Sequence, residues 1–266
     1  MTEIFSKEGF SEAYPAGIER HFWHIARCDL IYRWISSELD PGDLVMDVGC
    51  GTGIVVNALK KKSLNIRGVE MGMASVMPEV ISEVRTGANL FDLDENIKSQ
   101  IRAVLLLDVL EHMQNRREFI ERIYRDLPNC RLVLVTVPAR MEVWSSYDEY
   151  WGHYLRYDRS VLEAEIASGG FAVKKTSYFF HWIYLTSLLF KAIGLSKSTE
   201  FQPIAETGVK ATFHRLVGWL SSWESRLMPG FVAGSSIICV ASRDSEKPLD
   251  TFLNAEENDR PQYEKE

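Results

Sequence analysis

Two clusters of side chains in this sequence carry the residue types that move protons. The first is Asp108-Val109-Leu110-Glu111-His112, which follows the largely apolar run 102–107. Such a run predicts a strand covered on both faces, and ligands of an open α/β sheet bind at the carboxyl ends of its strands. Asp108, Glu111 and His112 are therefore placed to do chemistry. The alternative is that Glu111 and His112 cap the next helix and shape a pocket.

The second cluster is the loop after the predicted strand 131–137, which contains His153. An imidazole titrates in the range needed to take a proton from an acceptor hydroxyl. Aromatic side chains around it could exclude water and pack on an apolar acceptor. In the alternative interpretation the loop is a lid packed by its own aromatics, and His153 is only hydrogen-bonded. The aromatic residues of this loop are Trp144, Tyr147, Tyr150, Trp151, Tyr154 and Tyr157.

A glycine turn lies at the centre of the elements that must position these groups. The apolar run 44–48 is followed by Gly49, Gly51 and Gly53, and then by a predicted helix over 54–62. Strand, glycine turn and helix form the layout of a nucleotide-type site. The spacing excludes a dinucleotide fingerprint, because Ile54 occupies the sixth position where a third glycine is needed. No Lys-Ser or Lys-Thr pair directly follows the last glycine of the turn, which excludes a P-loop.

Glu70 ends the next predicted strand, 65–70, and lies 17 residues after Gly53. A carboxylate has two oxygens, so it can accept hydrogen bonds from two ribose hydroxyls at once. The alternative is a surface glutamate at a strand end. Met71 could pack on an adenine face. The segment 73–85 is predicted to be helical, with Pro78 near its start or at a kink.

The stretch Val45-Met46-Asp47-Val48-Gly49-Cys50-Gly51-Thr52-Gly53 resembles motif I of class I S-adenosylmethionine-dependent methyltransferases, of the type 11 or type 12 kind. The loop Gly152-His153-Tyr154-Leu155-Arg156-Tyr157 resembles a pattern of a bacterial subgroup. The resemblance implies that S-adenosylmethionine is the cofactor. The residues implied to bind it are Asp47, Gly49, Cys50, Gly51 and Gly53 at the methionine end, Glu70 and Met71 at the nucleoside, and Asp108 and Val109 beside the adenine and methyl group.

Near the third strand, within 84–93, the family often has Gly-Asp, with the acid close to the adenine amino group. This chain has Gly87-Ala88 there, so Asn89 or Asp92 would take the place of the acid. The resemblance also extends to enzymes in which a divalent metal is held by an acid-and-histidine cluster. Here that set would be Asp108, Glu111, His112 and His153, whose ligand types suit Mg²⁺, Mn²⁺ or Zn²⁺. A metal-free pocket is the alternative, and we favour it.

The chain as a whole has 266 residues and a formal net charge of −7. It has no basic surface of the kind that binds nucleic acid. The four cysteines show no C-x-x-C pairing and no secretory signal precedes them, which predicts reduced thiols and a cytoplasmic protein. The predicted fold is α/β: a doubly wound, Rossmann-like, seven-stranded sheet with a helical insertion before the last strand. The predicted parts are an N-terminal helical cap (1–40), the cofactor-binding domain (41–177 plus 231–243), the insertion (178–230) and an acidic disordered tail (244–266).

Helix 18–39 of the cap has two interpretations. Either it folds over the cofactor, as helices before the first strand often do in this family, or Trp23 packs against the sheet and Arg27 sits at the surface.

The insertion has an unusual composition. Residues 178–190 contain no Lys, Arg, Asp or Glu, yet the stretch is too short for a confident transmembrane helix. A second predicted helix, 209–227, gathers Phe213, Leu216, Val217, Leu220 and Trp223 on one face, with basic residues elsewhere. Such a helix resembles an interfacial one, which predicts a protein peripheral at a membrane. The alternative is that both helices close over the core or form a dimer interface.

These features together predict an enzyme that methylates a small, apolar or lipid-linked acceptor at a hydroxyl. His153, with Glu111 or His112, would take the acceptor's proton. Two rivals stay open. One is an N- or C-methyltransferase, and the other is a membrane-associated binding protein that keeps the fold without catalysis.

Overall fold

The computed structural model describes residues 14–195 and 203–243. The predicted tail, 244–266, and the first residues of the predicted cap lie outside the described residues. The described strands form one seven-stranded sheet in the order β3-β2-β1-β4-β5-β7-β6, and only β7 runs antiparallel to its neighbours. The strands are β1 (Leu44–Val48), β2 (Ile66–Glu70), β3 (Val84–Thr86), β4 (Ile101–Leu107), β5 (Leu132–Pro138), β6 (Phe171–Phe179) and β7 (Ser236–Arg243).

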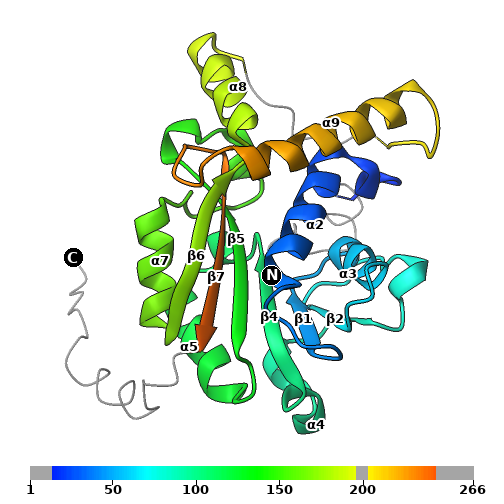
Figure 1. Cartoon of the computed structure of the whole chain (residues 1–266), viewed down its shortest axis with the longest axis vertical. Coiled ribbons are helices and arrows are strands. Elements are labelled where there is room, and N and C mark those ends of the chain that lie inside the picture. The colour runs from blue at the N-terminus through cyan, green and yellow to red at the C-terminus, as the bar shows by residue number, and fades with distance from the viewer. Residues whose placement is uncertain (1–13, 196–202, 244–266) are drawn as a thin grey trace.

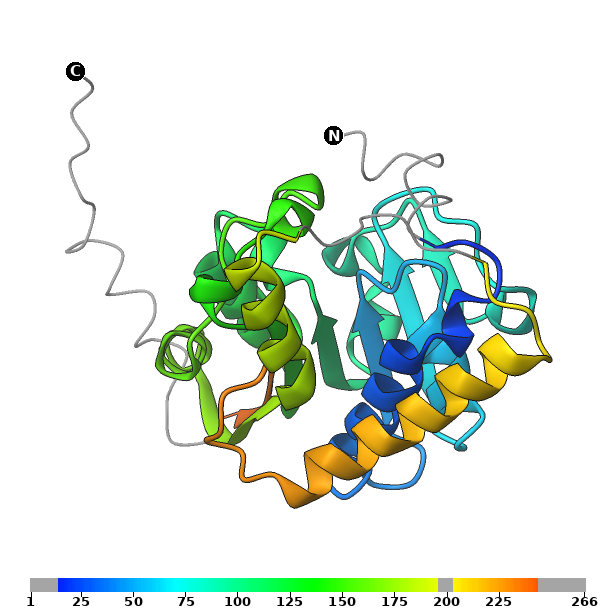
Figure 2. The same ribbon diagram turned by 90° about the horizontal axis from the view of Figure 1, so that it is seen from above.

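Helices cover both faces of this sheet (Figures 1 and 2). The helices are α2 (Phe22–Ile35), α3 (Ile54–Lys60), α4 (Glu95–Lys98), α5 (Arg116–Asp126), α6 (Ser146–Tyr150), α7 (Arg159–Ser168), α8 (His181–Ala192) and α9 (Val209–Leu227). Leu105 belongs to the core shared with α2 and α3, whereas Val104 and Leu106 belong to the core shared with α5 and α7. Because both faces of β4 are buried, its sequence is apolar without alternation. The predicted doubly wound sheet with an insertion before its last strand is confirmed.

The connections place the predicted chemistry at one edge of the sheet. β1 lies between β2 and β4, so the chain turns to opposite sides after β1 and β4 and leaves a crevice at their carboxyl ends. The glycine turn follows β1, Glu70 ends β2, and Asp108 follows β4. All three therefore lie at the same edge, where a ligand of this kind of sheet binds.

The predicted helix over 73–85 is wrong. This segment contains only the 3₁₀ helix Pro78–Val80, and β3 begins at Val84. Pro78 has no N–H to donate to a preceding turn. The backbone N–H of Met77 donates to the carbonyl of Thr52 (3.0 Å), so the segment is held against the glycine turn instead.

The predicted helix 18–39 is two separate helices in the structure, and the second one ends at Ile35. A 3₁₀ helix, Ile18–Arg20, comes first, and α2 begins at Phe22. His21 between them is extended, and its ring nitrogen accepts from the N–H of Trp23 (3.3 Å). That side-chain cap starts α2 as a separate helix.

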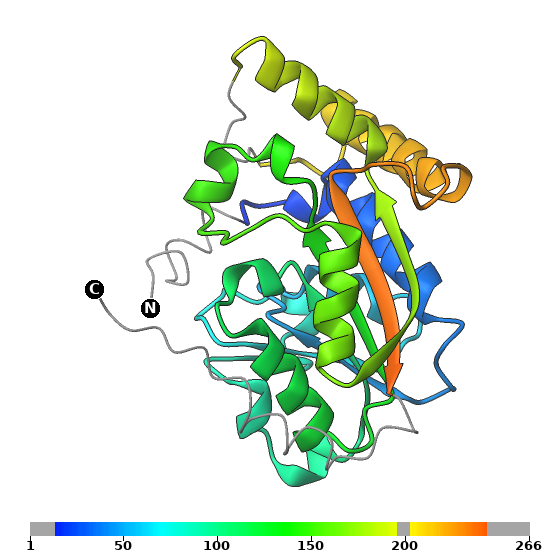
Figure 3. The same cartoon turned by 90° about the vertical axis from the view of Figure 1, so that its left-hand side faces the viewer.

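The insertion consists of α8 and α9, which lie beyond the carboxyl ends of the parallel strands (Figures 1 and 3). α9 packs along α2, and the side that it turns inward is small or polar. Its buried residues are Ala211, His214, Gly218, Ser221 and Ser222. No described helix is long and apolar enough to cross a membrane.

Gly218 sets how closely α9 approaches α2. A Cβ atom built on Gly218 would lie 2.9 Å from the Cβ of Ile25. Gly218→Val should therefore overpack this contact and lower the free energy of unfolding by about 1–3 kcal/mol. Denaturant unfolding measures the change. Leu216→Val, on the exposed side of the same helix, is the control and should change it by less than about 0.5 kcal/mol. Equal effects of the two substitutions would contradict the tight packing.

Candidate functional site

The glycine turn has the backbone that its sequence predicts. Gly49, Gly51 and Gly53 all have positive φ, with values of 71°, 55° and 86°. At Gly51 space is restricted as well, because an added Cβ would lie 3.1 Å from the hydroxyl of Tyr14. A side chain here would therefore be strained and would also press on Tyr14.

Glu70 braces this turn with both carboxylate oxygens. Its Oε2 accepts from the N–H of Gly51 (3.0 Å), and its Oε1 accepts from the N–H of Gly72 (2.8 Å). The residue is buried. Each oxygen has a second lone pair, so it can still accept from a ligand hydroxyl. The surface-glutamate alternative does not describe this residue.

Asp47 is a buried carboxyl group inside β1. Among the described residues, its Oδ1 has no hydrogen-bond partner. Burial raises the pKa of Asp47 to about 7, although the positive charge of Arg27 lowers it in part. A buried, unsatisfied carboxyl group is costly unless a donor or cation meets it. The ammonium group of a ligand would supply such a partner.

Asp108 is held at the end of β4 by an arginine from α2. Arg27 Nη2 lies 2.6 Å from Asp108 Oδ2 and also donates to Thr136 Oγ1 (3.1 Å). Asp108 has a positive φ of 57°, which is uncommon for a residue other than glycine. Arg27 is buried, so the interpretation that places it at the surface is wrong. A buried guanidinium needs a carboxylate, and Asp108 supplies it.

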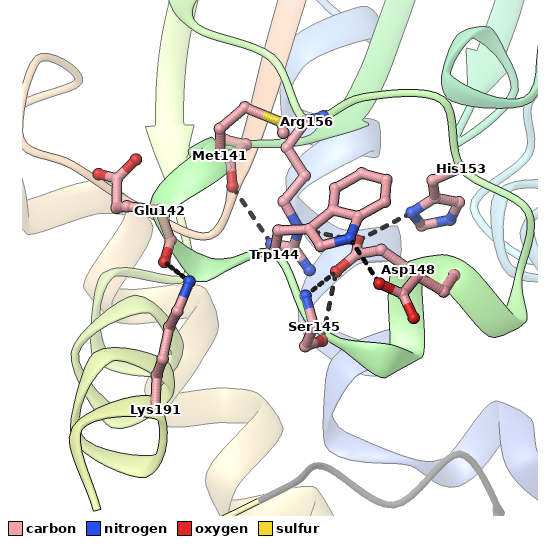
Figure 4. A network of polar contacts seen from close by, with 10 residues as sticks. Met141, Glu142, Trp144, Ser145, Asp148, His153, Arg156 and Lys191 are labelled. Atoms are coloured by element: carbon pink, nitrogen blue, oxygen red, sulfur yellow. Dashed lines mark hydrogen bonds and ion pairs between the residues drawn. The ribbon is translucent and has the colours of Figure 1, made fainter. Parts of the chain in front are cut away.

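The loop after β5 is built around one carboxylate, that of Asp148 (Figure 4). Its Oδ1 lies 2.9 Å from His153 Nδ1 and accepts from Arg156 Nε (2.7 Å). Its Oδ2 accepts from the N–H of Ser145 (2.9 Å), which begins α6. Burial alone would raise the pKa of Asp148. The hydrogen bond with His153 and the charge of Arg156 outweigh burial and lower that pKa to about 2. The ionised carboxylate can only accept, so Nδ1 of His153 is the nitrogen that donates to it, and Nε2 is the ring nitrogen on the far side from that bond.

His153 meets two residues of the first cluster. Each of Glu111, His112 and His153 offers one side-chain atom that could ligate a metal ion, and these atoms all lie within 4.8 Å of one another. The N–H of Tyr154 donates to the carbonyl of Glu111 (2.8 Å), which joins the loop to the end of β4. The two loops predicted to carry chemistry are thus in contact. Within the described part of the chain, Asp108 is not a member of this group.

Glu111 is the most buried member, with 0% of its surface exposed. In the described structure neither of its carboxylate oxygens has a hydrogen-bond partner. Burial and the neighbouring Asp108 raise the pKa of Glu111 well above its usual value. Burial, with the neighbouring His153, lowers the pKa of His112 to about 4. The predicted helix-cap role is wrong, because Glu111 and His112 lie in the 3₁₀ helix Leu110–His112 and Asn115 is the N-cap of α5.

A buried carboxylate and two imidazoles are ligands that suit a divalent cation. The three residues therefore fit the metal that the sequence resemblance implies, although with one acid fewer than the predicted set.

The remaining predicted cofactor residues lie around the same edge. Val109 packs against the glycine turn, 3.0 Å from where a Cβ on Gly49 would lie, and Cys50 packs on Gly68. Met71 is exposed. Asp92 is also exposed, at the end of the 3₁₀ helix Leu90–Asp92. The structure thus places all of these residues, and their roles in binding stay predictions.

Three residues of the site were absent from the predicted set: Arg27, Asp148 and Arg156. Asp148 and Arg156 lie in the recognised loop, five residues before and three after His153, so local spacing could have found them. Arg27 gives no such signal, because its partner Asp108 is distant in sequence.

The sequence of this chain is similar to those of known methyltransferases. A family model described as a methyltransferase domain matches residues 22–173. The ubiquinone biosynthesis O-methyltransferases of Pseudomonas fluorescens (strain Pf0-1) and Pseudomonas entomophila (strain L48) are each 28% identical to this chain over 100 residues. That match covers 35% of this chain and 43% of each relative, so it spans less than half of their length.

Solved structures show the same fold. The methyltransferase domain of bacterial CtHen1-C has a TM-score of 0.51 and 12% identity, and the match covers 83% of this chain and 98% of that one. Phosphoethanolamine N-methyltransferase 2 of Haemonchus contortus, in complex with S-adenosyl-L-methionine, has a TM-score of 0.50 and 16% identity, covering 90% of this chain and 60% of that one. At these identities the likeness concerns the fold alone.

The carboxylate of Asp148 should make the free energy of unfolding depend on pH in the acid range. Its folded pKa lies below the ordinary value of 3.8, so its contribution is present above that value and is lost as the pH falls towards 2. Asp148→Asn should lower the free energy of unfolding at pH 6, and the difference from the unmodified chain should be about 1 kcal/mol smaller at pH 3. Denaturant unfolding at the two pH values measures this. A difference that does not change with pH would contradict the ion pairs drawn here.

Proposed function

This chain belongs to the S-adenosylmethionine-dependent methyltransferases, and from that premise we propose that it methylates a hydroxyl group of a small, apolar or lipid-linked acceptor. The observation that carries the choice of a hydroxyl is the contact of His153 with the buried carboxylate of Asp148. A hydroxyl acceptor must lose a proton as it accepts the methyl group, and this pair supplies an oriented base. The O-methyltransferases of the two Pseudomonas strains, similar over 100 residues, support the same choice.

S-adenosylmethionine, when bound, supplies a methyl group that is already activated on a sulfonium. Two observations indicate that the residues of this chain fit S-adenosylmethionine. Glu70 presents two carboxylate oxygens with spare lone pairs for ribose hydroxyls. Asp47 presents a buried carboxyl oxygen that lacks a partner among the described residues, and the methionine ammonium would satisfy it. Gly49, Gly51 and Gly53 place no side chain of their own between the backbone of the turn and a ligand, which permits close approach.

The chain's task in the reaction is to orient the acceptor, hold its proton and exclude water. His153 accepts the hydroxyl proton on Nε2 while Asp148 stabilises the resulting imidazolium through Nδ1–H. The acceptor oxygen gains the methyl group as the bond between that carbon and sulfur breaks. Burial and the neighbouring Asp108 raise the pKa of Glu111 and so favour its neutral form, which adds no second negative charge beside the developing phenolate or alkoxide.

A second candidate is a metal-assisted methyl transfer. The two oxygens of Glu111 favour it, because neither has a hydrogen-bond partner among the described residues. Glu111, His112 and His153 would hold the ion, and it would polarise the acceptor hydroxyl. Under the favoured proposal, activity persists in excess chelator. Loss of activity in chelator, restored by Mn²⁺ or Zn²⁺, would instead support the metal-assisted reaction.

Glu70→Ala should weaken the binding of S-adenosylhomocysteine by about a hundredfold or more. The reason is that a carboxylate accepting two hydrogen bonds is removed, each worth about 1.5–3 kcal/mol. Isothermal titration calorimetry measures the affinity. Glu79→Ala, at an exposed glutamate of the neighbouring segment, is the control and should bind as the unmodified chain does. Unchanged affinity after Glu70→Ala would remove Glu70 from the cofactor site.

His153→Ala should lower kcat for a hydroxyl acceptor by about 10²–10⁴-fold and leave S-adenosylhomocysteine binding unchanged. The assay follows transfer of a labelled methyl group to phenols, catechols and amines that carry apolar tails. His181→Ala, a second buried histidine outside the site, is the control. Full activity of His153→Ala, or methylation of amines alone, would overturn the hydroxyl proposal.

A further inference from the structure

We propose that α8 and α9 form a docking face for an anionic lipid surface, with the outward side of α9 lying in the interface between headgroups and acyl chains. This goes beyond the proposed reaction, because lipid binding through these helices requires no methyl transfer. The face is defined by the exposed apolar residues of the two helices, and we call it the α8–α9 face.

The packing of α9 fixes which side faces out. Its inner side is bonded to α2 at three points along its length. The N–H of Phe22 donates to His214 Nδ1 (3.4 Å), the hydroxyl of Ser222 bonds to Asp29, and Arg33 donates to Ser225 Oγ (2.7 Å). The small and polar residues are therefore committed to the protein, and the apolar residues cannot turn inward without breaking these bonds.

The outer side of α9 is a continuous apolar stripe. Phe213 is 59% exposed, Leu216 54% and Leu220 51%. The stripe recurs at three- and four-residue spacing along the whole helix, which is about 28 Å long at 1.5 Å per residue. Its members are Val209, Phe213, Leu216, Leu220, Trp223 and Leu227. An ordinary soluble domain would bury such a side, so its exposure marks an interaction surface.

α8 adds a second stripe made of Trp182, Leu185, Leu189 and Ile193, all exposed. The two helices are joined by Glu224 of α9, which accepts from the N–H of His181 (2.6 Å) and lies 2.7 Å from its Nδ1. Figures 1 and 3 both place the two helices at the same end of the molecule.

The charges around the face select the occupant. The sequence of α8 contains no acid, and that of α9 contains only Glu224, which is bonded to His181. Lys210 and Arg215 are exposed on α9. At the end of α9, beside the exposed Phe231, a hollow is lined by Arg33, Arg159, Lys175 and Arg226. Asp29 and Glu163 offset part of this charge by pairing with Arg33 and Arg159.

Exposed cations beside an apolar, tryptophan-bearing stripe fit an anionic bilayer surface, where cations meet headgroups and the stripe enters the acyl boundary. A second copy of this chain fits less well, because pairing two α9 helices would bring their cations together. The excess of cations is local, since the whole chain carries a formal charge of −7.

The α8–α9 face is connected to the loop that carries His153. Lys191 of α8 donates to the carbonyl of Glu142 (2.8 Å), and the hydroxyl of Tyr184 donates to the carboxylate of Glu142 (2.8 Å) (Figure 4 shows the first contact). Docking would therefore hold this loop next to the lipid. On the proposed function, this places the active site where a membrane-borne acceptor could enter.

Flotation of the full chain with vesicles tests the proposal. Vesicles of phosphatidylglycerol in phosphatidylcholine should carry the protein, and vesicles of phosphatidylcholine alone should carry much less. The double variant Leu216→Ser and Leu220→Ser should lower the partition coefficient by about a hundredfold, about tenfold for each leucine withdrawn from an apolar environment. The matched control is Val161→Ser with Ile81→Ser, two exposed apolar residues outside the face, and it should float as the unmodified chain does.

A charge substitution tests the attraction to anionic headgroups separately from the insertion of the apolar stripe. Arg215→Glu should reduce binding to the anionic vesicles, whereas Arg117→Glu, at an exposed arginine of α5, should not. Equal flotation with the two kinds of vesicle, or equal flotation of the leucine variant and its control, would overturn the proposal. So would a dimer, seen by sedimentation, that the leucine variant dissociates. Unchanged S-adenosylhomocysteine binding by the leucine variant shows that a loss of flotation is not a failure of the enzyme.

Discussion

The candidate active site depends on one buried carboxylate, that of Asp148. It accepts hydrogen bonds from a histidine, an arginine and the backbone at the start of α6, and none of its surface is exposed. A charge buried in this way is stable only when its partners stay in place. Asp148 therefore determines both the course of the loop after β5 and the orientation of the His153 ring.

The sheet supplies the second half of the site. The ends of β1, β2 and β4 bring together Asp47, Glu70 and Asp108, and each is held by a different device: burial inside a strand, two backbone N–H groups, and an arginine from α2. The loop joins this edge through the hydrogen bond from Tyr154 to the carbonyl of Glu111. The groups proposed to bind the cofactor and to move the proton thus share one support, which suits a reaction that mainly requires alignment.

Features with a local signal could be predicted from the sequence. The glycine turn, the acid that ends β2 and the order of helices and strands follow from spacing and periodicity, and the described structure has them. The helix predicted over 73–85 is absent because Pro78 has no N–H to donate to a preceding turn and the backbone there bonds to the glycine turn. The place of Arg27 stayed open in the sequence, because a buried ion pair joins residues far apart along the chain.

The orientation of α9 shows what sequence periodicity leaves open. Periodicity showed that the helix has an apolar side, and that side would ordinarily be expected to pack inward. Close approach to α2 requires small residues at the contact, as Gly218 shows, so the apolar side faces out. Sequence periodicity identifies two faces of a helix, but only the neighbouring surface determines which of them is buried.

The most direct test of the account compares methyl transfer to a series of phenols of increasing acidity, by the unmodified enzyme and by His153→Ala, at one pH. If His153 removes the acceptor proton, the deficit of the variant should be large for weakly acidic phenols and should shrink for phenols already ionised in solution. A deficit of the same size across the whole series would contradict the central claim, because His153 would then act only by shaping the site.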